Sequence, residues 1–267
     1  MPPRFVLPGV SEKNREGKRA ARERLVAERE REKTREKRRR VYVAGGSVVA
    51  ALAVAGAVGV FVAQGSGGRS AAADGKVVVP KGASGEDGLA IPVGSPEAKS
   101  TLTVWEDFRC PACAQFENTY RSVVDDLVDK GSLKVEYHLA TLIDKNMRGT
   151  GSRRAANAAV CAQDAGKFRP FHDVLYRNQP GEADDAYAKE DKLFGLAGQV
   201  PGLVTPDFKK CVQDGRHDGW VDKSDQAFQK GGFRGTPAVL LNGKDVFSDQ
   251  KNPLTPAKLK QTVERAG

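Results

Sequence analysis

The sequence predicts one α/β domain that is interrupted by an α-helical insert. Two observations lead to this fold class. Strand and helix patterns alternate at the start of the domain, and strand patterns return near its end after about ninety residues of helical pattern. With 267 residues, of which 39% are hydrophobic, the chain is long enough to bury the core of such a domain.

The N-terminal tail carries nearly all of the chain's excess charge. Residues 1–40 contain 15 Lys and Arg and 7 Asp and Glu, a net charge of +8 out of +9 for the whole chain. The rest of the protein is close to neutral, without the basic surplus that is typical of nucleic-acid binding. We therefore expect no nucleic-acid partner, and we interpret residues 1–40 as a basic cytoplasmic tail.

An apolar run follows the tail. Residues 41–63 contain no charge, and at about 1.5 Å per residue a helix of this length reaches roughly 34 Å, enough to cross a bilayer. The run is longer than the core of a cleavable signal peptide, although Ala71–Ala73 resembles a cleavage site. We expect a retained single-pass transmembrane helix in the lipid bilayer, with the basic flank in the cytoplasm and the rest of the chain extracytoplasmic.

Residues 64–88 contain seven glycines and no sustained apolar period, which predicts a flexible tether. The folded domain is then expected over residues 89–267. Its first strand is predicted at Thr101–Phe108, which is rich in β-branched and aromatic residues. Apolar residues at helical spacing follow Cys113 and predict a helix, which we expect to end at Gly131.

The remaining elements complete the expected domain. Alternation over Leu133–Leu139 predicts a second strand and a βαβ unit. Residues 143–233 read as the helical insert, with helix caps at Ser152 and at Thr205-Pro206. A hairpin is expected from 238–241 through Asn242-Gly243 to 246–247, and the last helix is expected after Thr255-Pro256.

Cys110 and Cys113 form a C-x-x-C motif at the predicted strand-to-helix turn. Such a pair serves either zinc binding or sulfur redox chemistry. The sequence offers no second spaced pair, and His138, His172 and His217 show no ligand spacing, which disfavours a metal site. A purely structural bond across so short a loop would add little stability. The motif therefore indicates a redox-active pair, with no metal and no other cofactor.

The position of the two sulfurs assigns their roles. At a helix N-terminus, unpaired N–H groups favour thiolate over thiol, so Cys110 is the predicted nucleophile. Pro111 fits the first helical position because it has no N–H to leave unpaired. Cys113 lies one turn further on and is the predicted resolving partner.

Three motifs carry a family resemblance: "GSPEAKSTLTVWEDFRCPACAQFE", "RRAANAAVCAQDAGKFRPFHDVLYRNQ" and "GGFRGTPAVLLNG". Together they resemble the bacterial thioredoxin-like disulfide oxidoreductases of the DsbA type over most of residues 89–267. The resemblance implies a thioredoxin fold with an inserted α-helical subdomain. It also implies a cis peptide before Pro237, packed beside the redox pair, with Thr236 and Pro237 in contact with the substrate.

The chain departs from that family near the motif. Many relatives have an acidic residue six positions before the first cysteine, where this chain has Val104. We expect proton transfer to the resolving thiol to depend on Glu106, Asp107 or water instead. Pro111-Ala112 lacks the histidine that strongly oxidising relatives place before the second cysteine, so the direction of electron flow stays open.

Cys161 and Cys211 both lie in the predicted insert. In an oxidising compartment two such thiols usually pair, and we expect a structural disulfide between them. The alternative is two buried free thiols that act as small hydrophobic residues.

The sequence thus predicts a monomeric, membrane-anchored thiol:disulfide oxidoreductase that oxidises exported proteins and is reoxidised by a membrane partner. The alternatives are the reverse reaction, such as disulfide reduction for cytochrome maturation, and disulfide isomerisation. Isomerisation is disfavoured because the tether leaves no room for a dimerisation domain. A non-catalytic binding module of the same fold is a further alternative, although it would have no need of both Cys110 and Cys113.

Overall fold

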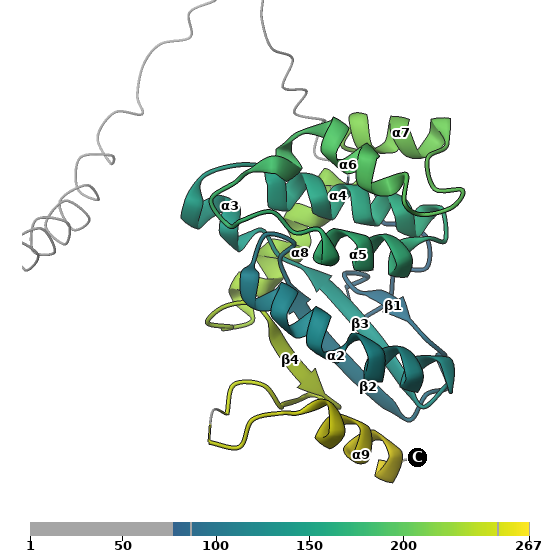
Figure 1. The fold of residues 1–267 in the computed structure, drawn as a ribbon, viewed down its shortest axis with the longest axis vertical. Helices are drawn as coiled ribbons and strands as arrows, with labels where there is room; N and C mark the ends of the chain where they lie inside the picture. The colour runs from purple at the N-terminus through teal and green to yellow at the C-terminus, as the bar shows by residue number, and fades with distance from the viewer. Residues whose placement is uncertain (1–76, 86, 250, 267) are drawn as a thin grey trace, which may run out of the picture. The chain divides into compact units, whose positions relative to one another are not determined.

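The structure is a computed structural model that describes residues 77–85, 87–249 and 251–266 (Figure 1). The predicted cytoplasmic tail, the predicted transmembrane helix and residues 64–76 of the predicted tether lie outside the described residues. Among the residues that are described, no helix is both long enough and apolar enough to span a membrane.

A five-stranded sheet forms the centre of the domain, in the order β1-β3-β2-β4-β5. Strands β2 and β3 are parallel, and the other neighbouring strands are antiparallel. Helix α2 connects the parallel pair, which gives the predicted βαβ unit. The strands are β1 (Ile91–Val93), β2 (Ser100–Glu106), β3 (Leu133–Leu139), β4 (Ala238–Leu241) and β5 (Lys244–Asp245).

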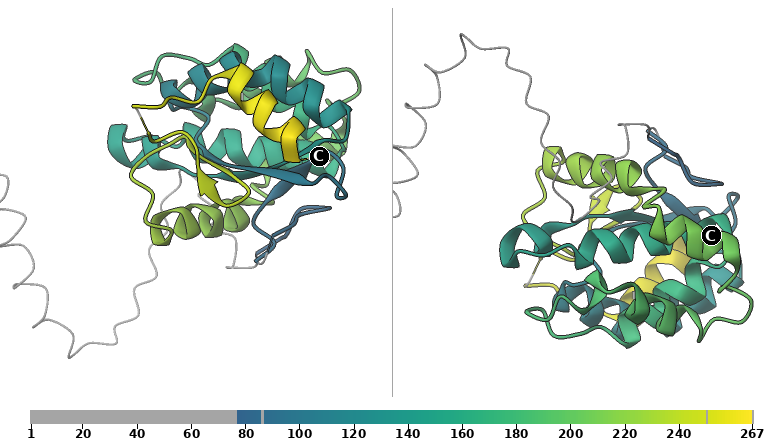
Figure 2. Two further views of the ribbon diagram at one scale, coloured as in Figure 1. Left: turned by 90° about the horizontal axis from the view of Figure 1, so that it is seen from below. Right: turned by 90° about the horizontal axis from the view of Figure 1, so that it is seen from above.

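Helices cover both faces of the sheet (Figure 2). Helices α2 (Pro111–Asp129) and α9 (Pro256–Ala266) lie side by side on one face. Successive residues of β2 point to opposite faces. Val104 therefore joins the main core, whereas Trp105 packs with Phe228 of α8 (Asp218–Lys230) on the other face.

The helical insert packs around α4 (Gly151–Asp164), whose small side chains are buried on nearly all sides. Helices α5, α7 and α8 all contact it. The expected α/β thioredoxin fold with an inserted helical region is thus confirmed. The other helices between β3 and β4 are α3 (Leu142–Met147), α5 (Phe168–Arg177), η1 (Ala186–Ala188), α6 (Glu190–Ala197), α7 (Pro206–Gln213) and α8 (Asp218–Lys230).

The end of the predicted tether is part of the folded unit, contrary to expectation. We call the described residues between 77 and 88 the strap. Its Lys81 N–H donates to Asp164 Oδ1 at 2.9 Å, and its Gly88 carbonyl accepts from Trp220 Nε1 at 2.8 Å. These bonds, which join segments far apart in the chain, left no periodic signal in the sequence. Within the described residues, the folded unit therefore includes the strap and extends further toward the N-terminus than Leu89.

Smaller differences concern element ends. The first predicted strand ends at Glu106, two residues early, and the returning hairpin strand occupies 244–245 instead of 246–247. Ser152 lies inside α4, where Thr150 is the N-cap residue, so the predicted cap at Ser152 is wrong. Thr205 does cap α7 by accepting from Phe208 N–H at 3.1 Å, and the last helix begins at Pro256 as expected.

Candidate active site

Cys110 is the N-cap residue of α2 at the end of the β2–α2 turn. Its backbone is extended (φ −74°, ψ 118°), and Pro111 follows at the start of the helix. The Cys110 N–H donates to Asp107 O at 2.9 Å, and the Cys110 carbonyl accepts from Ala114 N–H at 3.2 Å. The turn thus holds the Cys110 sulfur at the end of the helix where backbone N–H groups lack partners.

Cys110 and Cys113 are both free thiols, 7% and 0% exposed. A hydrogen bond from the Cys113 thiol lowers the pKa of Cys110 to about 6 in spite of burial, helped by the N–H groups of Cys113 and Ala112. Burial, followed by the bond to Cys110, raises the pKa of Cys113 well above its usual range. The pKa is thus lowered at Cys110 and raised at Cys113, as a nucleophile and its resolving partner require.

The Thr236–Pro237 peptide lies against the first sulfur. The peptide is cis, and β4 begins with the next residue. The Cys110 thiol donates to the Thr236 carbonyl at 3.2 Å, although 126 residues separate the two in the chain. The fold brings this segment, for which the family resemblance implies substrate contact, directly to the C-x-x-C motif.

Glu106 and Asp107, the acidic residues expected to replace the one that relatives have at the position of Val104, are completely buried. The two carboxylate oxygens of Asp107 accept backbone N–H bonds, from Arg109 at 2.8 Å and from Ile143 at 2.9 Å. Burial nevertheless raises the pKa of Asp107 to about 7. Glu106 differs, because its Oε2 atom has no hydrogen-bond partner among the described residues.

Glu106 belongs to a buried charge cluster that the sequence analysis missed. Its Oε1 lies 2.8 Å from His172 Nε2 of α5, and Glu117 of α2 completes the group. Burial opposes a charge on His172, but Glu106 and Asp173 raise its pKa to about 10. Burial raises the pKa of Glu117 to about 8. The charge of Glu106 also contributes to the raised pKa of Cys113, so the cluster acts on the resolving thiol.

Arg109, next to the nucleophile, is a second buried charge that the sequence did not reveal. It is 1% exposed and forms ion pairs with Asp144 at 2.7 Å and Asp185 at 2.8 Å. Its Nη2 also donates to the Glu182 carbonyl at 3.0 Å. A side chain at Gly149 would collide with this group, because its Cβ would lie 2.7 Å from Arg109 Nη1. These contacts fix the catalytic turn to the helical insert.

A side-chain amide gives the turn another support. Gln179 Nε2 donates to the carbonyls of Phe108 at 2.8 Å and Cys110 at 3.0 Å. The nucleophile is therefore held by backbone bonds on its own helix and by side chains of the insert.

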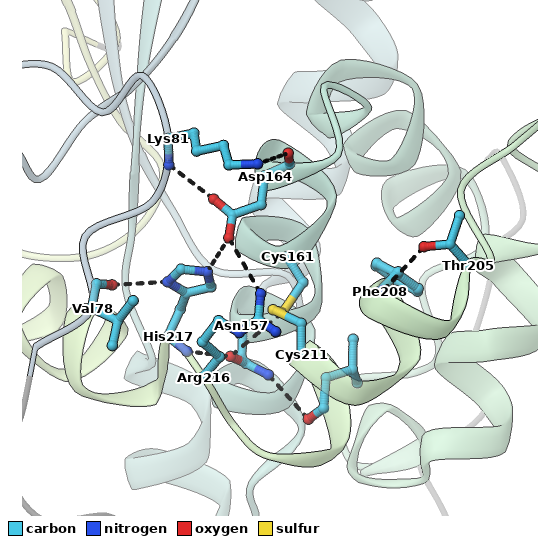
Figure 3. Close-up of a disulfide and its surroundings, with 11 residues drawn as sticks. Val78, Lys81, Asn157, Cys161, Asp164, Thr205, Phe208, Cys211, Arg216 and His217 are labelled. Carbon is cyan, nitrogen blue, oxygen red and sulfur yellow. Dashed lines mark hydrogen bonds and ion pairs between the residues drawn. A yellow bond between two sulfur atoms is a disulfide. The ribbon is translucent and has the colours of Figure 1, made fainter.

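The other two cysteines form a disulfide far from this motif in the sequence (Figure 3). The bond joins Cys161 of α4 to Cys211 of α7, 50 residues apart, with an S–S distance of 2.04 Å. Both cysteines are 2% exposed. Buried His217 lies beside the bond, where its Nε2 is 2.8 Å from Asp164 Oδ2.

Comparison with known proteins places this geometry among disulfide-exchange proteins. A family described as Thioredoxin matches residues 86–265. A "probable disulfide bond formation protein D" of Bacillus cereus is 27% identical over 153 residues, which cover 57% of this chain and 69% of that protein.

Solved structures from Mycobacterium tuberculosis are similar in fold and in sequence. Oxidised DsbA is 28% identical, with a TM-score of 0.57 over 66% of this chain and 92% of that one. A reduced disulfide bond oxidoreductase named DsbG is also 28% identical, with a TM-score of 0.56 over 66% of this chain and 86% of that one.

Proposed function

The chain belongs to the thioredoxin family and is a DsbA-like thiol:disulfide oxidoreductase, and from this premise we propose that it oxidises the dithiols of exported proteins. The proposed redox pair is Cys110 and Cys113. The proposed orientation is a cytoplasmic tail, one membrane-spanning helix over residues 41–63 and an extracytoplasmic catalytic domain, and it rests on the charge and length of those segments.

The proposed reaction begins with the disulfide form of the pair. A substrate thiolate attacks Cys110 Sγ, the Cys110–Cys113 bond breaks, and Cys113 leaves with the electron pair and takes up a proton. The second substrate thiolate then attacks the substrate sulfur of the mixed disulfide, and Cys110 leaves as a thiolate. The substrate loses two electrons and gains a disulfide, while the pair gains two electrons. A membrane-bound oxidant must then remove them.

The observation that carries the oxidising direction is the stabilised thiolate of Cys110. Its pKa is lowered to about 6 by the Cys113 thiol and by helix N–H groups. A thiol of low pKa is a good leaving group, and stabilising it favours the dithiol form of the pair. A pair whose reduced form is favoured takes electrons from substrates.

Two further groups have proposed roles in this reaction. The Thr236–Pro237 segment borders the reactive sulfur and offers its backbone to an extended substrate strand. Glu106 is the favoured proton-exchange group for Cys113, because one of its oxygens is unpartnered among the described residues, whereas both oxygens of Asp107 are occupied.

The direction is tested by comparing the unfolding of two redox forms. Full-length protein with Cys161–Cys211 intact is prepared with the Cys110–Cys113 pair oxidised or reduced, and each form is unfolded with urea. The oxidase proposal requires the reduced form to be the more stable. Greater stability of the oxidised form would instead identify a reductase. Loss of substrate binding in Cys110→Ser, with no turnover by the wild type, would favour a binding module.

A further inference from the structure

The disulfide in the insert has an unexpected third neighbour. Cys161, Cys211 and His217 each place one potential metal-binding atom within 4.8 Å of the other two. They come from α4, from α7 and from the residue before α8, and all three are buried. Because these residues are widely spaced in the chain, they form no ligand motif that the sequence alone could reveal.

The imidazole of His217 is held as a metal ligand would be. Its Nδ1 lies 2.8 Å from the Val78 carbonyl of the strap, so this nitrogen carries a hydrogen and donates it. The opposite edge of the ring, with Nε2, points toward Asp164 on the side of the disulfide (Figure 3). Histidine ligands commonly donate their second N–H to a backbone carbonyl, which fixes the orientation of the ring.

Asp164 supplies a carboxylate at the same place. Its Oδ2 is 2.8 Å from His217 Nε2, and its Oδ1 accepts the Lys81 N–H at 2.9 Å. Arg216 Nη1 lies 4.0 Å from Oδ2 and balances negative charge there. The group therefore offers two sulfurs, one imidazole nitrogen and an oriented oxygen.

A cavity of about 310 Å³ adjoins these side chains, and both cysteines and Asp164 line it. In a tetrahedral site with Zn–S bonds of about 2.3 Å, two thiolates lie about 3.8 Å apart. Reduction would therefore require the sulfurs to separate, and the cavity gives their side chains room and gives an ion a path to them.

We propose that reduction of the Cys161–Cys211 bond converts this disulfide into a zinc site formed by Cys161, Cys211 and His217, with Asp164 at the fourth position. A dithiol reductant supplies two electrons and two protons, and itself becomes a disulfide. Binding of Zn²⁺ then releases the two thiol protons and the hydrogen that lies between His217 Nε2 and Asp164 Oδ2. Two thiolates, an imidazole and a fourth ligand form a tetrahedral zinc set. The insert is held together by either the disulfide or the ion.

The test uses full-length protein in which Cys110→Ser and Cys113→Ser remove the other possible thiol site. The protein is reduced with a phosphine, the phosphine is removed without air, and Co²⁺ is added as a spectroscopic probe. We expect one equivalent to bind, with thiolate-to-cobalt charge-transfer bands and the visible bands of a tetrahedral site, and Zn²⁺ to displace it. The oxidised sample should give neither set of bands.

Two variants make the result specific to these ligands. His217→Leu keeps both thiols and should weaken metal binding at least tenfold. Cys161→Ala leaves one thiolate and should weaken the charge-transfer bands to no more than about half their intensity. The far-ultraviolet circular dichroism and melting temperature of the reduced protein are measured with and without Zn²⁺. Zinc should raise the melting temperature of the reduced form and not that of the oxidised form.

Three outcomes would overturn the proposal. One is a folded, reduced protein that binds no Co²⁺. Another is unchanged binding in His217→Leu, which would show adventitious capture by two thiols. The third is a reduced protein that stays unfolded at saturating Zn²⁺, since the site must hold the insert together.

Discussion

The two pairs of buried cysteines differ in how the chain presents them. Cys110 and Cys113 lie on one helix start, where backbone N–H groups and the Thr236 carbonyl surround the first sulfur. Cys161 and Cys211 lie on two different helices, and buried His217 lies beside both sulfurs. The first pair is a dithiol and the second a disulfide.

Burial alone therefore does not make a thiol inert. All four cysteines are at most 7% exposed. What separates them is the set of groups that can stabilise a negative charge, together with the length of chain that a bond between them would close. A bond across 50 residues constrains the unfolded chain strongly, and a bond across three residues does so weakly.

The largest expected difference between the pairs is in turnover. Cys110→Ser should abolish the oxidation of a reduced substrate protein, because no sulfur remains for the substrate to attack. Cys113→Ser should accumulate mixed disulfides through Cys110, which non-reducing electrophoresis detects. Replacing both Cys161 and Cys211 by Ala should leave turnover within about twofold of wild type at a temperature where the variant is folded. Trapping through Cys113 in a Cys110→Ser protein would reverse the assigned roles.

For stability, the Cys161–Cys211 pair should matter more than the Cys110–Cys113 pair. Removing the Cys161–Cys211 bond by the double Ala replacement should lower the free energy of unfolding by about 4 kcal/mol, the chain-entropy value for a loop of this length. Urea unfolding with Cys110–Cys113 oxidised in both proteins measures this change. If reducing the Cys110–Cys113 bond lowered the free energy of unfolding by the same amount, the two pairs would not differ in their contribution to stability.

Beside each pair, a buried histidine contacts a carboxylate, and these two contacts can be compared. Glu106→Gln leaves His172 without its completely buried partner and should cost about 3 kcal/mol of unfolding free energy. Asp164→Asn should cost less, because the Asp164 side chain is 16% exposed to water. Equal losses in the two variants would show that burial does not govern these contacts.

The same cluster predicts how stability depends on pH. The folded-state pKa of His172, raised from 6.5 to about 10, stabilises the fold below pH 6.5, and this contribution is lost as the pH rises through about 10. The raised pKa of Glu117, about 8, acts in the same direction. The oxidised protein, in which no cysteine titrates, should thus lose stability between pH 6.5 and 10, and Glu106→Gln should lose less. A flat profile would rule out a charged His172.

A smaller effect concerns the titration of the nucleophile itself. The thiolate absorbance of the reduced protein should titrate with a midpoint of about 6. Cys113→Ala removes the largest stabilising bond, so the midpoint should rise toward the free-thiol value of about 8.5. Cys113→Ser keeps a hydrogen-bond donor and should shift it less. An unchanged midpoint in Cys113→Ala would assign the stabilisation to the Thr236 side chain and the helix N–H groups instead.

The smallest expected effect is on the helix that carries Cys211. Thr205→Ala removes the cap of α7 and should lower the free energy of unfolding by about 1 kcal/mol, whereas Thr205→Ser retains an oxygen acceptor and should cost less. Urea unfolding measures both changes, and the loss should not affect turnover. A fall in turnover as large as that in stability would mean that α7 supports the catalytic turn.

Much of the fold could be predicted because its signals are local. The β-branched run before Cys110 and the alternation in 133–139 are properties of adjacent residues, and so is the start of the last helix at Pro256. Strand β1 was missed because three residues are too few for a pattern. The glycines and charges of the strap predict a tether, because no local pattern reveals its contacts with Asp164 and Trp220.

The site was predictable to the extent that its chemistry lies in contiguous motifs. The cysteine pair and the Thr236-Pro237 dipeptide are short motifs, and the structure places them together. Arg109 and His172 gave no such signal, because charged and polar residues of this kind usually lie at the surface. Their burial follows from partners 35 and 66 residues away, which no local pattern contains.

The contacts of the catalytic turn also determine when it can form during synthesis. Glu182, whose carbonyl holds Arg109, lies 73 residues after Arg109, and Thr236 lies 126 residues after Cys110. Both leave the ribosome well after Cys110. Until those segments arrive, the growing chain carries a Cys110 thiol without its supports. The reactive centre of the enzyme is therefore among the last parts of the domain to form during synthesis.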